Sequence, residues 1–270
     1  MIKVYAVSRD GASQDIEVNT TMFPGGEVHV SVGLDIPADS LRLHAHLPNA
    51  AAVMTLLLVT DALRRAYPGL PLSLHMPYVP YARQDRVANP GEALSAKVFC
   101  DLINAQGYSR VLIQDPHSDV VPALLDRVVI EDPLPALRKV LAQVGPVALV
   151  APDAGARKRV LKLAQQLGCD VVFADKVRDT RTGAITGTQV AGSLPALPLL
   201  VVDDICDGGR TFTELATVLR ARQIEQDLHA PLYLYVTHGI FSKGPEPLLA
   251  HYRQLFTRNN WSGDLRCALV

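Results

Sequence analysis

The segment 199–211, with the sequence LLVVDDICDGGRT, constrains the fold more than any other part of the chain. Four apolar residues lead into Asp203 and Asp204, and a glycine pair precedes a helical apolar pattern that starts at Phe212. A continuous apolar run is typical of a parallel strand that is buried on both faces. Ligands bind at the carboxyl ends of such strands in open α/β sheets. The segment therefore predicts a strand, a ligand-binding loop and a helix.

The loop of this segment has the chemistry of a sugar-phosphate site. Residues 207–211 precede or open the helix, where backbone N–H groups and the helix dipole favour an anion. Asp203 and Asp204 are suited to accept hydrogen bonds from hydroxyl groups. An acidic cap after an ordinary strand would explain a single Asp-Gly pair. Three acids, two glycines and a threonine coincide here, and this favours a binding function.

Composition narrows the class of protein. The 270 residues include 26 basic and 27 acidic ones, so the net charge of −1 gives no support to a nucleic-acid surface or an anionic-membrane surface. The four cysteines form no C-x-x-C pair, which indicates reduced thiols and neither zinc nor disulfides. We find no signal-peptide core and no apolar run of membrane-spanning length. A cytoplasmic enzyme with a local anion site is expected.

Three polar segments of the first half are further candidates. The turn Phe23-Pro24-Gly25-Gly26-Glu27 presents an aromatic ring and an acid, although a lone Phe23 is more simply a core residue. The loop 77–86 holds two prolines and ends in Arg83, Gln84, Asp85 and Arg86, which suit a base and its phosphates or an ordinary salt-bridged surface. The segment 115–119 places His117 between two acids, where it would meet a phosphate or Mg²⁺, or follow a capping Asp.

The second half repeats the same order of elements. Asp132-Pro133 separates a domain 1–133 from a domain 134–270, and Asp153 follows a strand as Asp115 does. The polar segment 175–183 is expected to form a loop or flap. Its Lys176 and Arg178 alternate, and thus share one face of an extended chain; a solvated basic loop is the simpler alternative. The tail 255–270 receives no assignment.

Five segments, in this order, resemble the ribose-phosphate diphosphokinase family, which has the type I phosphoribosyltransferase fold. They are residues 77–86, 115–117, 152–155, 175–178 and 203–211, and residues 237–242 resemble a sixth. The resemblance implies an α/β protein with two phosphoribosyltransferase-like domains, each a mainly parallel sheet flanked by helices. It also implies transfer of the β,γ-diphosphoryl group of ATP to the C1 hydroxyl of ribose 5-phosphate. Mg²⁺ as cofactor and a homo-oligomer, dimer or hexamer, are expected.

The resemblance also implies roles for individual residues. ATP would be bound by the first domain through Phe23, Glu27, Arg83, Gln84, Asp85 and His117. The ribose phosphate would be bound by Asp203, Asp204, Asp207, Gly208, Gly209, Arg210 and Thr211. The metal would be held by His117, Asp153, Asp203 and Asp204. Lys176, Arg178 and His117 would act in catalysis, the two cations by stabilising the transferring group.

The chain departs from the family pattern at informative places. The phosphate loop of the family usually reads Asp-Thr-Gly-Gly-Thr, whereas residues 207–211 read Asp-Gly-Gly-Arg-Thr, so a hydroxyl is lost and the guanidinium of Arg210 is gained. Gly25 stands where an adenine-reading acid or amide is usual, and Pro116 where leucine is usual. Arg210 leaves open the same chemistry on a larger 5-substituted ribose such as ADP-ribose, in NAD salvage. A phosphoribosyltransferase and a non-catalytic regulatory paralogue are the remaining alternatives. The presence of His117, Asp153, Lys176 and Arg178 speaks against the last.

Overall fold

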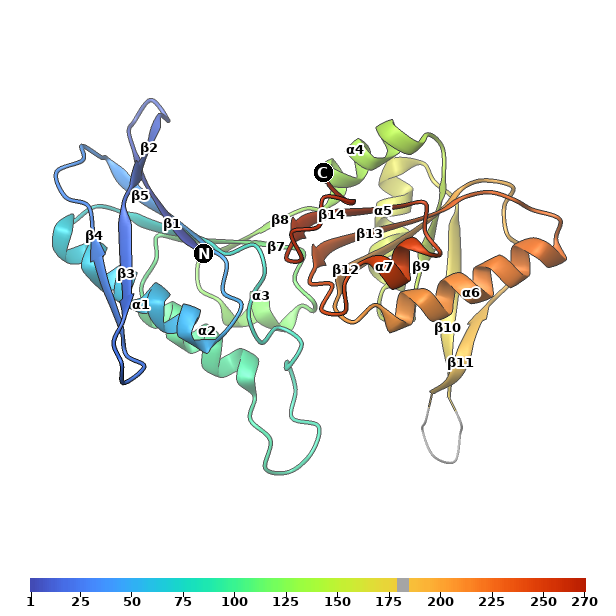
Figure 1. Ribbon diagram of the computed structural model, residues 1–270, viewed down its shortest axis with the longest axis horizontal. Helices are drawn as coiled ribbons and strands as arrows, with labels where there is room; N and C mark the ends of the chain where they lie inside the picture. The colour runs from blue at the N-terminus through green and yellow to red at the C-terminus, as the bar shows by residue number, and fades with distance from the viewer. Residues whose placement is uncertain (179–184) are drawn as a thin grey trace. The chain divides into compact units, whose positions relative to one another are not determined.

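The computed structural model describes the backbone of residues 1–178 and 185–270, and the side chains of residues 1–175 and 187–270. The chain divides into two compact units, Met1–Asp132 and Pro133–Val270 (Figure 1). Within the described ranges, no helix has the length and apolar character needed to cross a membrane.

The first unit is built on a six-stranded sheet with the order β2-β1-β5-β6-β7-β8. Strands β5 to β8 run parallel, and β1 pairs antiparallel with both β2 and β5. The elements of the sheet and its helices are β1 Ile2–Val7, β2 Ser13–Ile16, β5 Ser40–Ala45, α1 Ala50–Ala66, β6 Leu72–His75, α2 Ser95–Ala105, β7 Arg110–Gln114, α3 Val120–Leu124 and β8 Val128–Glu131.

One face of this sheet carries the core of the unit. In β5, Leu41, Leu43 and Ala45 are buried, whereas Arg42 and His44 point to the other face, as the two-residue repeat of a strand requires. The buried residues pack with Leu56, Leu63 and others from α1 and α2. A hairpin of β3 Val18–Met22 and β4 Val28–Val32 forms a separate two-stranded sheet that packs on α1.

The second unit has a seven-stranded sheet with the order β11-β10-β9-β12-β13-β14-β15. All neighbours are parallel except the pair β10/β11. Its elements are α4 Leu134–Val144, β9 Ala148–Ala151, α5 Arg157–Leu167, β10 Val171–Arg178, β11 Ile185–Val190, β12 Leu199–Cys206, α6 Arg210–Glu225, β13 Leu232–Gly239, α7 Glu246–Leu249, β14 Gln254–Asn260 and β15 Cys267–Leu269.

The central strands of this unit are buried on both faces. Leu199 and Val201 of β12 pack with residues of α6, while Leu200 and Val202 pack with residues of α4 and α5. Helices thus cover the two faces separately (Figure 1), which is why the strand reads as an unbroken apolar run. The expected α/β fold with mainly parallel sheets is confirmed.

Several sequence-based boundaries were wrong. The strand β12 ends at Cys206, so Asp203 and Asp204 lie near its carboxyl end, as expected, whereas other boundaries differ. Helix α6 begins at Arg210, which moves Arg210 and Thr211 from the loop into the first helical turn. Backbone pairing with β11 extends β10 to Arg178, although a loop was expected from residue 175. The unassigned tail contributes most of β14 and all of β15 to the sheet.

Candidate functional site in the two units

Asp203 and Asp204 lie near the carboxyl end of β12, and a single arginine engages both. Arg159 of α5 donates a hydrogen bond from Nη2 to Oδ1 of Asp203, and its Nη1 lies 3.3 Å from Oδ1 of Asp204. The side chains of the two acids are 16% and 8% exposed. The carboxylates are thus held beside a cation at the sheet's edge, where a ligand hydroxyl would meet acceptor oxygens.

Burial changes the ionisation of this pair. The pKa of Asp203 is raised to about 8, chiefly by desolvation and next by the Asp204 carboxylate, while the Arg159 guanidinium opposes both. Two carboxylates so close cannot both be charged without compensation. A bound cation or a hydrogen-bonding ligand would supply that compensation.

The segment 207–211 surrounds the start of α6. Gly209 caps the helix with φ +78°, and an added Cβ there would lie 3.4 Å from Leu248, so both the backbone and the space favour glycine. Because glycine has no side chain to cap the helix, no capping hydrogen bond forms within the described structure. The N–H groups of Phe212 and Thr213 return to the carbonyl of Gly209. The first-turn N–H groups of Arg210 and Thr211 face outward from the helix end, as an anion site requires.

A second loop, which follows β13, is tied to this segment. The N–H groups of Ile240 and Phe241 both donate to the carbonyl of Cys206, at 2.9 and 3.1 Å. The Ser242 N–H donates to the Asp207 carbonyl at 3.1 Å, and its hydroxyl donates to Asp207 Oδ1 at 2.6 Å. Phe241 has a left-handed φ of +49°, which is costly for this residue type and is typical of functional loops. The acid Asp207 is therefore fixed by the neighbouring loop.

Asp153 lies directly after β9, where it was expected. Its Oδ1 accepts a hydrogen bond from the Ala156 N–H at 3.2 Å, just before α5 begins. This bond fixes Asp153 beside Ala156, although α5 itself has no side-chain cap. The predicted contribution of Asp153 to a metal site remains a prediction.

The cations expected on the flap are described only in part. The backbone of Lys176 and Arg178 belongs to β10, where they lie two residues apart. Their side chains lie outside the described residues. Asp175, the residue before Lys176, forms an ion pair with Arg157 of α5, so the start of this segment is joined to the same helix that holds Arg159.

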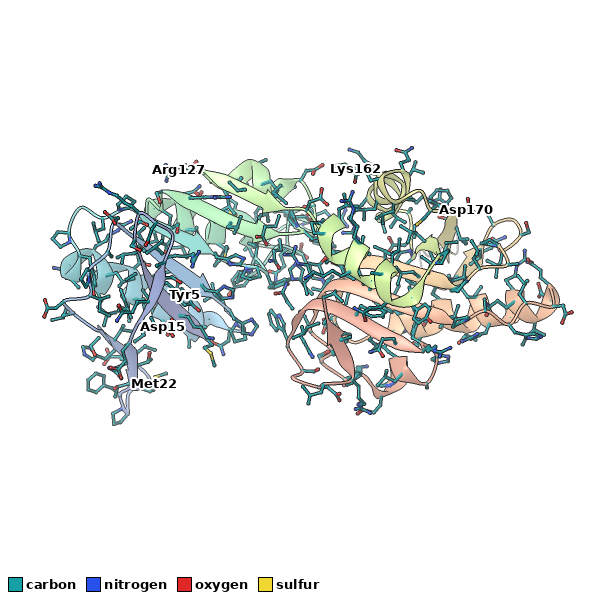
Figure 2. All side chains as sticks on the ribbon, turned by 90° about the horizontal axis from the view of Figure 1, so that it is seen from above. Tyr5, Asp15, Met22, Arg127, Lys162 and Asp170 are labelled. Carbon is teal, nitrogen blue, oxygen red and sulfur yellow. The ribbon has the colours of Figure 1, made fainter. Side chains whose placement is uncertain are left out.

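In the first unit, Phe23 and Glu27 close the tip of the β3–β4 hairpin. The Phe23 N–H donates to the Glu27 carbonyl at 2.8 Å. Figure 2 labels Met22 at the end of β3, beside this turn. The Phe23 side chain is 50% exposed, so the simpler interpretation of a core residue is wrong. Its ring packs edge-on to His29, and within the described ranges no ring contact joins it to Arg83.

The loop after β6 carries Arg83, Gln84 and Asp85. Tyr81 has a φ of +63° and its ring packs on Phe99 of α2, at 5.8 Å between centroids. The Gln84 carbonyl accepts the Ala96 N–H at 3.2 Å, which fixes the loop to the start of α2. Arg83 and Gln84 are exposed, and Asp85 is half-buried.

His117 follows β7, the strand next to β6. Asp115 is 6% exposed and has a φ of +37°, while His117 is exposed. The Gln114 N–H donates to the Pro77 carbonyl at 3.0 Å. The structure thus brings the segments 77–86 and 115–117 together at the carboxyl edge of one parallel sheet.

The donor set was examined for Mg²⁺. In the part of the chain with described side chains, no three His, Cys, Asp or Glu side chains converge on one metal position. Mg²⁺ commonly keeps several waters and binds through one or two carboxylates plus substrate phosphates. The pair Asp203 and Asp204 fits a Mg²⁺ that arrives with a phosphorylated substrate, but not a preformed protein cage.

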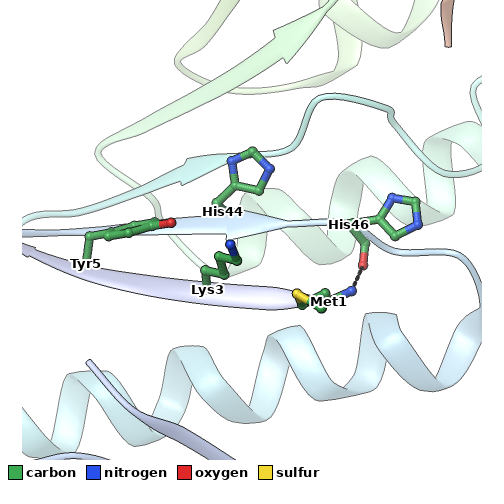
Figure 3. Close-up of a pocket in the computed structure, with 5 residues that line it drawn as sticks. All are labelled: Met1, Lys3, Tyr5, His44 and His46. Atoms are coloured by element: carbon green, nitrogen blue, oxygen red, sulfur yellow. Dashed lines mark hydrogen bonds between the residues drawn. The ribbon is translucent and has the colours of Figure 1, made fainter. Parts of the chain in front are cut away.

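A cavity of about 290 Å³ lies apart from all predicted site residues. It opens on the face of the first sheet opposite α1 and is lined by Met1, Lys3, Tyr5, His44 and His46 (Figure 3). Burial is the main cause that lowers the pKa of both histidines. The cavity has none of the acids and open helix ends that mark the second unit's site.

Sequence reasoning missed Arg159 and Lys243, and it gave no role to Ser242, although the segment 237–242 was noted. Arg159 had a signal: three cations, Arg157, Lys158 and Arg159, occupy the first turn of α5, where the helix dipole disfavours positive charge. Such a placement indicates tertiary acidic partners. Lys243 had no signal of its own, because its importance depends on the contact between two loops.

Comparison with known proteins identifies the family. A model of the N-terminal domain of ribose phosphate pyrophosphokinase matches residues 6–107, and a phosphoribosyl transferase domain model matches residues 136–232. A ribose-phosphate pyrophosphokinase of Aquifex aeolicus is 33% identical over 233 residues, which cover 83% of this chain and 72% of the relative. One of Cereibacter sphaeroides is 30% identical over 248 residues, covering 89% and 71%.

A solved structure supports the fold. The crystal structure of phosphoribosylpyrophosphate synthetase from Mycobacterium smegmatis aligns with a TM-score of 0.75 at 24% identity, covering 92% of this chain and 81% of that one. The order of the sequence segments, the two parallel-sheet units and these relatives agree. The chain belongs to the ribose-phosphate pyrophosphokinase family.

Proposed function

We propose that this chain is an enzyme that transfers the β,γ-diphosphoryl group of ATP to the C1 hydroxyl of ribose 5-phosphate, giving phosphoribosyl pyrophosphate and AMP. The observation that carries the proposal is the buried carboxylate pair beside an open helix start, at the carboxyl edge of a parallel sheet, in a member of this family. Carboxylates suit ribose hydroxyls, and helix N–H groups suit a phosphate.

The second unit would bind the acceptor. The 5-phosphate would lie against the first-turn N–H groups of α6, and Asp203 and Asp204 would accept hydrogen bonds from the ribose hydroxyls. Arg159 already engages both carboxylates, so it would orient them. This arrangement would hold the C1 hydroxyl in a fixed place relative to the incoming phosphate.

The first unit would bind ATP. Phe23 and Arg83 are exposed and offer flat faces to adenine, while Glu27, Gln84 and Asp85 lie in the same two loops. His117 stands at the end of β7, next to the loop that carries Arg83, where it would meet the phosphates. The domains 1–133 and 134–270 would thus each bind one substrate.

Diphosphoryl transfer requires positioning and neutralisation of charge more than a covalent nucleophile. Lys176 and Arg178, which lie two residues apart in the sequence, would donate hydrogen bonds to the transferring oxygens. Mg²⁺ carried by the phosphates, with carboxylate oxygens of Asp203 or Asp204 as ligands, would neutralise further charge.

The test is release of AMP from ATP and Mg²⁺ with each acceptor in turn. With ribose 5-phosphate we expect AMP and phosphoribosyl pyrophosphate in equal amounts, which ³¹P NMR would measure. If AMP is released with ADP-ribose and not with ribose 5-phosphate, the acceptor is a larger 5-substituted ribose and the proposed acceptor is wrong. Consumption of phosphoribosyl pyrophosphate with a free base, without any AMP release, would make the protein a phosphoribosyltransferase.

The variant Lys176→Ala tests the catalytic role. It should lower kcat at least 100-fold, because oriented charge stabilisation of a transition state contributes about 3 kcal/mol or more, and leave ATP binding unchanged in calorimetry. Lys139→Ala on α4, where the lysine is exposed, is the matched control. Unchanged kcat in Lys176→Ala would contradict the assigned role.

A further inference from the structure

Lys243 lies across the candidate phosphate loop. Three carbons of its side chain, Cε, Cδ and Cγ, lie 3.7, 3.8 and 4.0 Å from the position that a Cβ would take at Gly208. The stem therefore lies beside the open face of Gly208, at the place that a side chain there would fill. Since Gly208 directly precedes the helix cap Gly209, this stem lies next to the segment that opens α6.

The position of Lys243 is fixed by its neighbours. Four hydrogen bonds join the segment 240–242 to Cys206 and Asp207: those of the Ile240, Phe241 and Ser242 N–H groups and that of the Ser242 hydroxyl. The turn closes through the Gly244 N–H and the Phe241 carbonyl at 2.8 Å, with Gly244 at φ +75°. Lys243 thus lies on a turn whose preceding residues are hydrogen-bonded to the phosphate loop.

The charge of Lys243 is not used within the described structure. Arg210, the other cation at this helix start, forms an ion pair with Glu214 at 2.6 Å, and Arg159 is engaged by Asp203 and Asp204. Among residues with described side chains, none forms an ion pair with Lys243. A cation beside a helix start is opposed by the dipole, so an anion between them would be attracted by both.

We propose that Lys243 binds the phosphate of the acceptor, together with the first-turn N–H groups of α6, and so sets the affinity of the enzyme for phosphorylated ribose. The inference rests on the proposed function, because that function places the acceptor phosphate at this loop. Lys243 acts on binding and not on the transfer step, since its stem lies beside Gly208, in the loop that would hold the phosphate of the acceptor and not the hydroxyl that reacts.

The variant Lys243→Met tests this inference, because methionine keeps an unbranched stem along Gly208 and removes the charge. The KM for ribose 5-phosphate should rise about tenfold, the loss expected for one exposed charge-assisted hydrogen bond. The kcat and the KM for ATP should stay within about twofold. Inorganic phosphate, as a competitor of the acceptor, should inhibit about tenfold more weakly, and Lys243→Arg should restore most of the affinity.

Lys162→Met is the matched control, since Lys162 is an exposed lysine of α5, labelled in Figure 2, and lies outside the predicted site. Calorimetric binding of ribose 5-phosphate to each variant separates this inference from the proposed function. If the wild-type protein turns over ribose 5-phosphate and Lys243→Met binds it equally well, the inference is overturned and the function stands. If the wild type binds ribose 5-phosphate without turnover and Lys243→Met binds it tenfold more weakly, the function fails and the inference stands.

Discussion

Gly239, the last residue of β13, permits the loop that holds Asp207. A Cβ at this position would lie 2.2 Å from Cε2 and 2.6 Å from Cζ of Phe241, which no real contact allows. Phe241 is 3% exposed and has a φ of +49°, so neither its ring nor its backbone can move without cost. We therefore expect Gly239→Ala to force the ring out of its place and to shift the loop 240–244.

The magnitude follows from these contacts. Overpacking of a well-packed core costs about 1–3 kcal/mol, and a displaced ring loses up to about 1.5–3 kcal/mol of apolar burial. If the ring moves, the overpacking is relieved, and if the ring stays, its burial is kept, so the two costs do not add. We therefore expect a loss of about 3 kcal/mol in the free energy of unfolding. For a unit of this size, that corresponds to a fall in Tm of roughly 6–10 °C.

Fluorescence of Trp261 provides the assay. It is the one tryptophan of the chain, and its backbone N–H donates to the Gly239 carbonyl at 2.9 Å, so its emission reports on the second unit at the site of the change. Gly187→Ala in β11 is the control, since no atom of the described side chains or backbone lies within 4 Å of its added Cβ. Equal melting temperatures for the two variants would refute the steric argument. A second readout is the KM for the acceptor, which should rise only in Gly239→Ala, because only that change moves the loop.

Two further predictions concern a titrating acid and a buried hydroxyl pair. The raised pKa of Asp203, about 8, means that folding favours its protonated form, so the contribution of this group to stability is present below about pH 4 and is lost as the pH rises towards 8. Asp203→Asn should flatten this part of the plot of Tm against pH, with Tm followed by Trp261 emission. An unchanged slope would contradict the prediction. In the first unit, the hydroxyl groups of Thr60 and Tyr108 lie 2.6 Å apart in the core, so Thr60→Val should cost about 1–3 kcal/mol in urea unfolding by leaving the phenol without its partner, whereas Thr60→Ser should retain the wild-type midpoint more closely.

The elements that were predicted well are those with a strong apolar period and clear terminators. An apolar helical pattern in the sequence predicts a helix over 50–66 and an apolar run predicts a strand over 110–114, and α1 and β7 have these bounds. At the start of α1, the side chain of the N-cap Asn49 accepts the Ala52 N–H at 2.9 Å. The helix ends where Tyr67-Pro68-Gly69 interrupts the apolar pattern. In both cases local sequence and tertiary packing favour the same structure.

The strands that were missed lack such a pattern. In β3, four of five residues are exposed, and in β2 only Ile16 is buried. These strands are held by backbone pairing with β4 and β1 and contribute little to the core. No apolar alternation exists for such a segment, so the sequence cannot reveal it. Of the hairpin that carries Phe23, the sequence predicts the turn and a second strand over 28–34, which corresponds to β4, but not the first strand β3.

The site shows the same limit in its electrostatics. Asp203 and Asp204 could be found because acids at the end of an apolar strand are unusual, but their partner Arg159 lies 44 residues earlier. Arg157 and Arg159 stand in the first turn of α5 against its dipole, and each is offset by an acid of a neighbouring strand, Asp175 and Asp203. Removal of either acid would thus leave a cation that the helix itself disfavours. Ion pairs therefore connect α5 both to β10, the strand of Lys176 and Arg178, and to the acids of β12. A ligand that draws Asp203 away from Arg159 would leave the charge of Arg159 uncompensated, on the same helix whose Arg157 pairs with Asp175.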